Sequence, residues 1–418
     1  MTLLFFLYTV FIAMLAYNLY YPNYTNDKLS VLSFLCGWLV GELAMHHVVL
    51  QLIAVFWFAW AGAVDGFVGA VCLVICAISW LTMTFFHLNG HRAKQVMEDS
   101  LQQGLGQDYS QAIKPDFQQQ FPADIDYRKI RWPKKLISAE LEVMKNIPYG
   151  SNSQRLDIYR QRAGTEKSTQ RPVLLQIHGG AWTEKMGSKN EQALPLMNHM
   201  ALRGWLCVAI SYRLSPSATF PEHIIDCKEA LVWIKNTIAS YGGNPDFVVV
   251  TGGSAGGHLS SLLALSANDP QYQPGFEEAD TTVQGAVPYY GVYDFSDSEG
   301  LQQHNGLAQT LQQSVMKLSI KENSETYQQA SPLHRTGPQA PPFCIIQGDK
   351  DTLVPAVTAR SFAKKLAVES NNPVVYAEIS GAQHAFDMFP SIRSEHVKHG
   401  VERYLAWLYS AYLAVGKA

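Results

Sequence analysis

Residues 247–258 read Phe-Val-Val-Val-Thr-Gly-Gly-Ser-Ala-Gly-Gly-His, with the serine at position 254. The apolar, mostly β-branched start predicts a buried strand, and the glycines after it predict a sharp turn into a helix. In a G-x-S-x-G turn of this kind the serine backbone is strained, and small neighbours let other elements pass close by. We therefore expect Ser254 to be a nucleophile raised above the edge of a sheet; the alternative is a glycine-rich turn without chemistry.

A nucleophilic serine needs a histidine base and a carboxylate that orients the base, which follow it in the order acid, then histidine. The predicted strand 343–347 leads into a loop with two acids, Asp349 and Asp351, and the predicted strand 374–379 is followed by His384. Because the carboxyl ends of parallel strands share one edge of the sheet, His384 and Ser254 should meet there. The residues alone do not decide whether Asp349 or Asp351 orients the histidine, and either acid could instead cap the following helix.

Acyl transfer also needs backbone amides that stabilise a negatively charged oxygen. The predicted strand 173–177 runs into His178-Gly-Gly-Ala-Trp182, where glycines without side chains would let N–H groups face the site. We expect Gly179 or Gly180 to supply one donor and Ala255, directly after the serine, to supply the other.

From residue 142 onward, short β-rich runs alternate with longer helical ones, which is typical of a mostly parallel sheet with helices on both faces. Eight strands are predicted, at 142–147, 155–160, 173–177, 206–211, 247–251, 283–289, 343–347 and 374–379. Helices are predicted at 190–203, 223–241, 255–267, 357–369 and 394–414. The predicted fold class is therefore α/β.

Charge divides the chain into parts. The net charge is −3 and 47% of the residues are hydrophobic, which argues against a nucleic-acid partner and for a full core. The first 86 residues contain only four charged side chains, whereas 89–141 is polar and rich in glutamine. We predict a transmembrane region at 1–88, a polar linker, stalk or cap at 89–141, and a catalytic domain at 142–418. Residues 294–332 form a predicted lid within that domain.

Two uncharged runs, 3–21 and 66–86, are long enough to cross a bilayer. Between them, 29–64 is apolar but contains Glu42, His46 and His47, which fits one long tilted span or a short hairpin with its polar tip near the headgroups. We predict about three transmembrane helices. The first run lacks a basic start and a small-residue cleavage site, so we interpret it as an uncleaved anchor rather than a signal peptide.

Basic residues after the last span predict the orientation. Arg92 and Lys94 follow it closely, and five more Lys and Arg residues lie within 128–135, which predicts a cytoplasmic catalytic domain. Glu42 and His46 would share a helix face, and we interpret them as an interfacial turn or a satisfied pair rather than a proton or metal site. Neither these residues nor the six cysteines have a metal-site spacing, and no disulfide framework is expected.

The chain resembles the α/β-hydrolases, specifically hormone-sensitive-lipase-like enzymes and carboxylesterases of the feruloyl and acetyl-xylan esterase group. The matching motifs, in family order, are His178-Gly-Gly-Ala-Trp182, Tyr212-Arg-Leu-Ser-Pro216, Gly252-Gly-Ser-Ala-Gly-Gly257, Gly348-Asp-Lys-Asp-Thr-Leu-Val-Pro355 and His384. They cover about two thirds of the chain, from residue 142 onward. One departure is Gly253, where the lipase-like branch commonly has an acid.

This resemblance implies a serine carboxylesterase with Ser254, Asp351 and His384 as catalytic residues, favouring Asp351 over Asp349. Gly179, Gly180 and Ala255 would form the oxyanion hole, and no cofactor or metal is implied. The implied substrate is a small-molecule or lipid-like ester, and the sequence does not define an oligomeric state. Two alternatives stay open: an amidase, arylformamidase or peptidase with the same triad, and a catalytically silent, membrane-tethered binding module.

Overall fold

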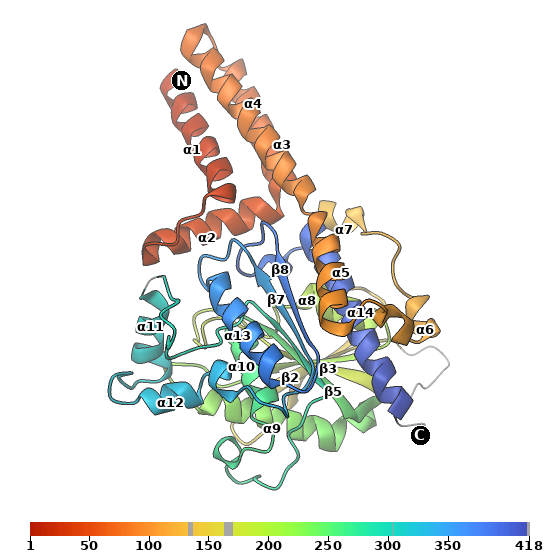
Figure 1. Ribbon diagram of the computed structural model, residues 1–418. Helices are drawn as coiled ribbons and strands as arrows, with labels where there is room; N and C mark the ends of the chain where they lie inside the picture. The colour runs from red at the N-terminus through yellow and green to blue at the C-terminus, as the bar shows by residue number, and fades with distance from the viewer. Residues whose placement is uncertain (133–136, 163–169, 304, 416–418) are drawn as a thin grey trace.

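The computed structural model of the protein describes residues 1–132, 137–162, 170–303 and 305–415. Lys134 and Lys135, two of the basic residues used to predict the orientation, lie outside these ranges, as does part of the predicted linker. The chain forms a sheet covered by helices on both faces, with a group of N-terminal helices projecting from one edge (Figure 1).

The described residues form a sheet of eight strands, the number predicted, in the order β1-β2-β4-β3-β5-β6-β7-β8. Among the described strands, β2 is antiparallel to both of its neighbours, β1 and β4. Every neighbouring pair from β4 to β8 is parallel. The strands are β1 (Leu141–Pro148), β2 (Arg155–Gln161), β3 (Arg171–Ile177), β4 (Leu206–Ser211), β5 (Gly243–Gly253), β6 (Gly285–Tyr289), β7 (Phe343–Gly348) and β8 (Val374–Ile379).

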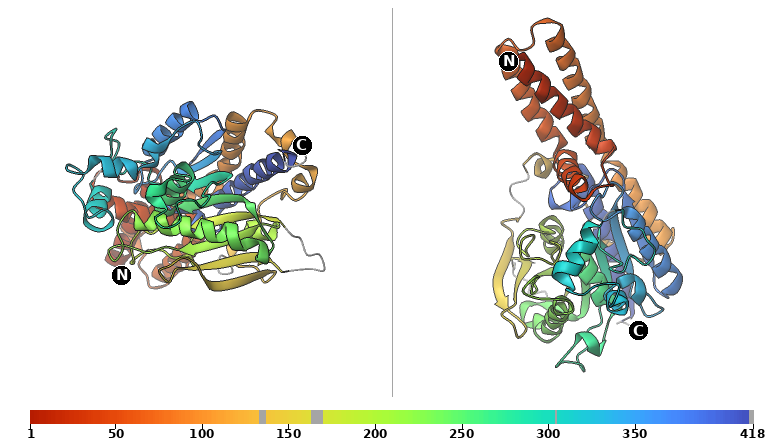
Figure 2. Two further views of the ribbon diagram at one scale, coloured as in Figure 1. Left: turned by 90° about the horizontal axis from the view of Figure 1, so that it is seen from below. Right: turned by 90° about the vertical axis from the view of Figure 1, so that its left-hand side faces the viewer.

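Each face of the sheet carries its own core, because side chains alternate along a strand. In β3, Val173 and Leu175 belong to one buried cluster and Leu174 to the other. The first cluster includes residues of α9 (Glu222–Thr237), α10 (Ala255–Leu265) and α13 (Ala356–Glu369). The second includes residues of α5 (Arg92–Leu105), α8 (Leu194–Leu202) and α14 (Ile392–Val415), on the opposite face (Figure 2).

The described part of residues 89–141 begins with a helix that packs on the sheet domain. Helix α5 packs against β8 and α14, and a short 3₁₀ turn after it also contacts α14. Two short helices follow, α6 (Pro115–Gln118) and α7 (Tyr127–Arg131). The predicted lid region contains α11 (Gly306–Thr310), a π-helical turn at Leu311–Val315 and α12 (Ser324–Gln329).

Among the described residues, the helices at the N-terminal end are α1 (Thr2–Tyr20), α2 (Asp27–Glu42), α3 (Ala44–Trp60) and α4 (Gly66–Asn89), and they come before α5. Among the described residues, α1 and the helical stretch beginning at Gly66 are long and apolar enough to cross a membrane. Helices α2 and α3 would add a third span only if counted together, and they are bent by 91° at their junction. Thus 29–64 is not one straight helix; α2 crosses the base of the projecting helices while α3 runs alongside α4 (Figures 1 and 2).

Candidate active site

Ser254 lies in the turn between β5 and α10 and has a backbone that residues with side chains rarely adopt, with φ 58° and ψ −120°. Its amide donates to the Tyr289 carbonyl at 3.0 Å, which ties the turn to the end of β6. A Cβ atom at Gly252 or Gly256 would lie within 2.5 Å of the Ile177 carbonyl oxygen. The two glycines are therefore required for the close approach of β3 to this turn.

His384 and Asp351 are joined at the same edge of the sheet, in the loops after β8 and β7. The His384 Nδ1 atom lies 2.7 Å from Asp351 Oδ2. The other carboxylate oxygen accepts from the amides of Leu353 at 2.9 Å and Val354 at 2.8 Å. Because Asp351 is buried and held by these amides, its carboxylate fixes the orientation of the imidazole ring.

Asp349, the competing acid, has a different partner. Its Oδ1 atom accepts from the Gly381 amide at 2.7 Å, and burial raises the pKa of its carboxyl group. Asp349 therefore connects the loops after β7 and β8, whereas Asp351 contacts His384. The Ser254 hydroxyl forms no hydrogen bond within the described part of the chain, so the structure joins two of the three predicted catalytic side chains directly.

The predicted oxyanion donors lie beside the serine. A Cβ atom at Gly179 would be 3.1 Å from the Ser254 Cβ atom, and Ala255 begins α10, where first-turn amides lack acceptors within the helix. The Gly179 amide donates to the Gln192 side chain, so it already has an acceptor. Gly180 has φ 111° and passes so close to Met186 that a Cβ atom would lie 1.8 Å from its carbonyl oxygen.

Tyr290 and Asp387 are site residues that the sequence analysis missed. The Tyr290 ring centroid lies 4.6 Å from that of His384, and its hydroxyl donates to Asp387. Burial raises the pKa of Asp387 to about 6. The same ring explains the departure at Gly253, where a Cβ atom would lie 2.7 Å from the Tyr290 hydroxyl oxygen. A side chain at 253 and the tyrosine at 290 cannot occupy this space together.

The motif residues His178 and His258 are structural. His258 accepts from the Trp182 indole at 3.2 Å and donates to the Ala330 carbonyl at 2.8 Å, and burial lowers its pKa to about 3. His178 stacks on Tyr212 with a ring separation of 4.6 Å, and burial lowers its pKa to about 4. Both rings are therefore neutral and hold the loops that follow β3 and β4.

Helix α2 also reaches this site, although its sequence predicted part of a membrane span. The Phe34 ring lies edge-on to His384 with a centroid separation of 6.0 Å, and the Trp38 indole donates to the Ala385 carbonyl at 2.9 Å. Glu42 pairs with Arg393 of α14 at 2.7 Å rather than with His46. The acid and the histidine four residues later therefore do not form a common site.

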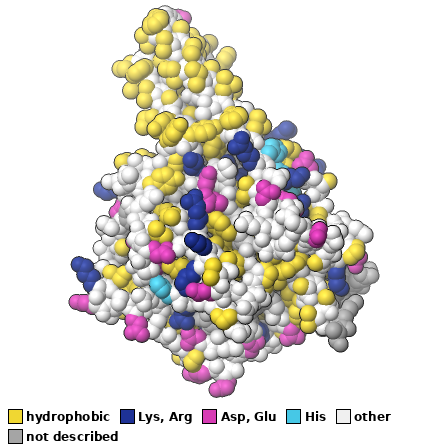
Figure 3. Space-filling model, viewed as in Figure 1, with side chains coloured by type: hydrophobic (Ala, Val, Ile, Leu, Met, Phe, Trp, Pro, Cys, Tyr) yellow, Lys and Arg dark blue, Asp and Glu magenta, His cyan; other side chains and the backbone are white. Residues whose placement is uncertain are grey.

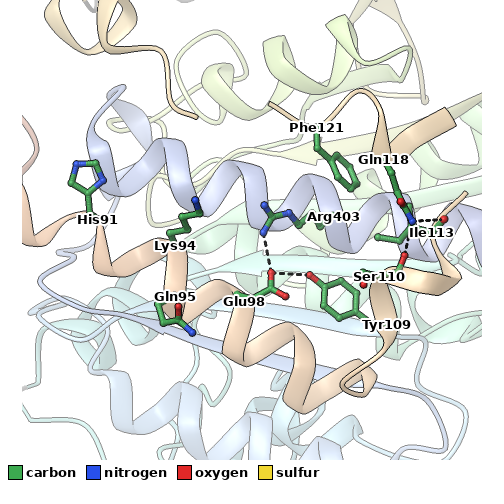
Figure 4. Close-up of a pocket in the computed structure, with 10 residues that line it drawn as sticks. All are labelled: His91, Lys94, Gln95, Glu98, Tyr109, Ser110, Ile113, Gln118, Phe121 and Arg403. Atoms are coloured by element: carbon green, nitrogen blue, oxygen red, sulfur yellow. Dashed lines mark hydrogen bonds and ion pairs between the residues drawn. The ribbon is translucent and has the colours of Figure 1, made fainter. Parts of the chain in front are cut away.

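A cavity of about 640 Å³ lies elsewhere, between α5 and α14 (Figure 4). Glu98 crosses it and accepts from the Tyr109 hydroxyl and from Arg403, each at 3.0 Å. Its lining contains none of the predicted catalytic residues, so this cavity is distinct from the candidate active site. No group of three or more metal-ligating side chains occurs within the described residues.

The strand order and the Ser254 turn define an α/β-hydrolase fold, and solved structures share it. A truncated carbohydrate esterase from gut microbiota matches with a TM-score of 0.53 and 21% identity, over 65% of this chain and 98% of its own. The Thermogutta terrifontis esterase Est2 matches with a TM-score of 0.51 and 23% identity, over 65% and 91%. At these identities the likeness establishes the fold alone.

The chain belongs to the BD-FAE family, whose model matches residues 156–366. The protein named "Probable carboxylic ester hydrolase LipM" of Mycobacterium tuberculosis is 41% identical over 94% of this chain and 90% of its own length. "Esterase LipQ" of the same organism is 40% identical over 78% and 77%. The resemblance to α/β-hydrolase carboxylesterases is thus confirmed. Because LipM aligns with 94% of the chain, the similarity also extends into the N-terminal helices, beyond the motifs that begin at residue 142.

Proposed function

We propose that this protein is a membrane-anchored serine carboxylesterase that cleaves carboxylic esters through an acyl-enzyme intermediate. Its relatives LipM and LipQ are named as ester hydrolases. The chain is accordingly a hydrolase that acts on esters. The observation that carries the mechanism is the buried His384–Asp351 pair on the sheet edge where the strained Ser254 turn also lies.

In the proposed mechanism, Ser254 attacks the ester carbonyl while His384 Nε2 accepts the hydroxyl proton. Asp351 orients the ring through Nδ1 and stabilises the imidazolium ion. The amides of Gly180 and Ala255 donate to the developing oxyanion, while Gln192 holds the Gly179 amide in place. The carbon–oxygen bond breaks, the alcohol leaves with the proton from His384, and a water molecule deprotonated by His384 releases the acid from Ser254.

Membrane anchoring is supported by the apolar length of α1 and of the helix that begins at Gly66. Arg92 and Lys94 follow that apolar stretch directly, so we place the catalytic domain on the cytoplasmic side. No cofactor enters the proposed reaction.

The proposal is tested with the detergent-solubilised full chain and p-nitrophenyl esters. We expect Ser254→Ala to lower kcat at least about a thousandfold, because removal of a triad serine disables the whole catalytic unit. Ser110→Ala, at an exposed serine, is the matched control and should retain wild-type turnover.

A p-nitroanilide with the same acyl group tests the amidase alternative. Ser254-dependent turnover of the ester with no detectable turnover of the anilide supports the carboxylesterase, whereas Ser254-dependent turnover of the anilide supports the amidase. Ester hydrolysis that persists unchanged in Ser254→Ala, or a folded wild-type protein with no turnover of any ester, would contradict the proposal.

A further inference from the structure

Helix α2 lies over the edge of the sheet that carries the candidate active site, beneath the projecting helices (Figure 1). We propose that α2 forms the acyl-binding wall of this site, and that the substrates are long-chain esters that reach Ser254 from a membrane leaflet. This inference rests on the proposed esterase function, because it assigns the substrate class of the same site.

One face of α2 is fixed to the catalytic loops. The Thr352 hydroxyl, next to Asp351, donates to the Ser30 carbonyl at 2.9 Å, and the Trp38 indole donates to the carbonyl of Ala385, next to His384. The residues of this face recur at helical spacing: Ser30, Ser33, Phe34, Gly37, Trp38 and Gly41. The small residues allow the helix to approach closely, so the two aromatic residues face the loops that carry the acid and the base.

The aromatic side chains of α2 make an apolar surface directly beside the base. Phe34 contacts the His384 ring and stacks on Trp38 with a centroid separation of 5.6 Å, and Trp38 stacks on Phe389 at 5.0 Å. In the proposed site, an acyl chain bonded to Ser254 runs along this surface. Contact with these rings would remove apolar chain from water, and the gain increases with each buried methylene group.

The opposite face of α2 is aliphatic and exposed. Its large side chains are 37% to 56% exposed, and they are Leu29, Val31, Leu32, Leu35 and Leu39. Hydrophobic side chains cover the projecting helices and continue along their base, where α2 lies (Figure 3). A row of exposed leucines next to apolar helices of spanning length fits a helix lying in the plane of a membrane surface.

These two faces together place the candidate site directly under the membrane surface. An ester whose acyl chain is dissolved in the leaflet could slide past α2 to Ser254 while its chain stays in apolar surroundings. A soluble short-chain ester would gain little from the aromatic wall. These contacts therefore favour long acyl chains over acetyl groups as substrates.

The wall is tested with Phe34→Ala in the full chain, using p-nitrophenyl octanoate and acetate in detergent. We expect the ratio of kcat/KM for octanoate to that for acetate to fall at least fivefold, and Phe34→Leu to restore most of it. Leu35→Ala, on the opposite face of α2, should leave the ratio within twofold of wild type. An unchanged or increased ratio in Phe34→Ala would overturn the assignment of the wall.

Delivery from the membrane is tested with Leu32→Glu/Leu35→Glu in phosphatidylcholine vesicles. We expect hydrolysis of p-nitrophenyl palmitate in the vesicles to fall at least tenfold, and hydrolysis of soluble p-nitrophenyl acetate to stay within twofold. Val368→Glu, at an exposed valine on α13, is the control and should change neither rate. Flotation with the vesicles and labelling by a fluorophosphonate verify that each variant is inserted and folded.

The two proposals fail differently. Palmitate hydrolysis at the wild-type rate in the double glutamate variant, with Ser254-dependent acetate hydrolysis intact, would overturn membrane delivery and leave the esterase proposal standing. Loss of Ser254 dependence for every ester would instead remove the proposed function and this inference with it.

Discussion

At the scale of single residues, the candidate site depends on backbone carbonyls and amides as much as on reactive side chains. Asp351 accepts from two loop amides as well as contacting His384, so its position is fixed before a substrate arrives. Tyr290 fills the space beside Gly253 and lies against the His384 ring. Packing around the serine turn thus limits which residue types can occupy the neighbouring positions, such as 253.

The two loop acids give a matched pair of variants. Asp351→Asn should lower kcat about 10³- to 10⁴-fold, because an amide in place of the carboxylate favours the wrong tautomer of His384 and cannot stabilise its cation. Asp349→Asn should stay within tenfold of wild type, because an amide oxygen can still accept from the Gly381 amide. Steady-state kinetics with p-nitrophenyl acetate distinguish them. A larger loss for Asp349→Asn than for Asp351→Asn would reverse the assignment of the acid.

At the scale of elements, α2 is where the sequence and the structure differ most. Residues 29–64 predicted a single tilted span or a hairpin because their apolar composition satisfies the length of a membrane helix. Glu42 was the only acid in that run, and its partner Arg393 lies about 350 positions later, which no local pattern can reveal. The bend lies directly after this pair, because Glu42, which α14 holds through Arg393, is the last residue of α2.

The ion pair between Glu42 and Arg393 predicts a stability effect. Both side chains are almost fully buried, so Glu42→Gln would leave a buried cation without its counter-charge, at a cost of about 3–5 kcal/mol. The more exposed pair of Glu98 and Arg403 should be worth only about 0–1 kcal/mol. Thermal unfolding of the full chain in detergent should therefore show a clearly larger drop for Glu42→Gln than for Glu98→Gln. Equal drops would mean that the pair does not hold α2 in place.

At the scale of the whole molecule, the strands of the sheet could be predicted from the sequence, but their order could not. Every predicted strand appears, because buried β-rich runs between turn residues are a local signal. The strand order, the covering of the sheet by α5 and the position of α2 over the site depend on contacts between distant residues. Tyr290 illustrates the same limit, since only the folded chain brings it between the serine turn and His384.

The central claim is that Ser254 forms a covalent acyl-enzyme within a membrane-anchored hydrolase. The most direct measurement is mass spectrometry of the full chain after reaction with a fluorophosphonate. The account predicts one phosphonyl adduct, on the peptide that contains Ser254, with complete loss of ester hydrolysis and no adduct in Ser254→Ala. An adduct on another residue, or hydrolysis that continues after Ser254 is fully modified, would contradict it.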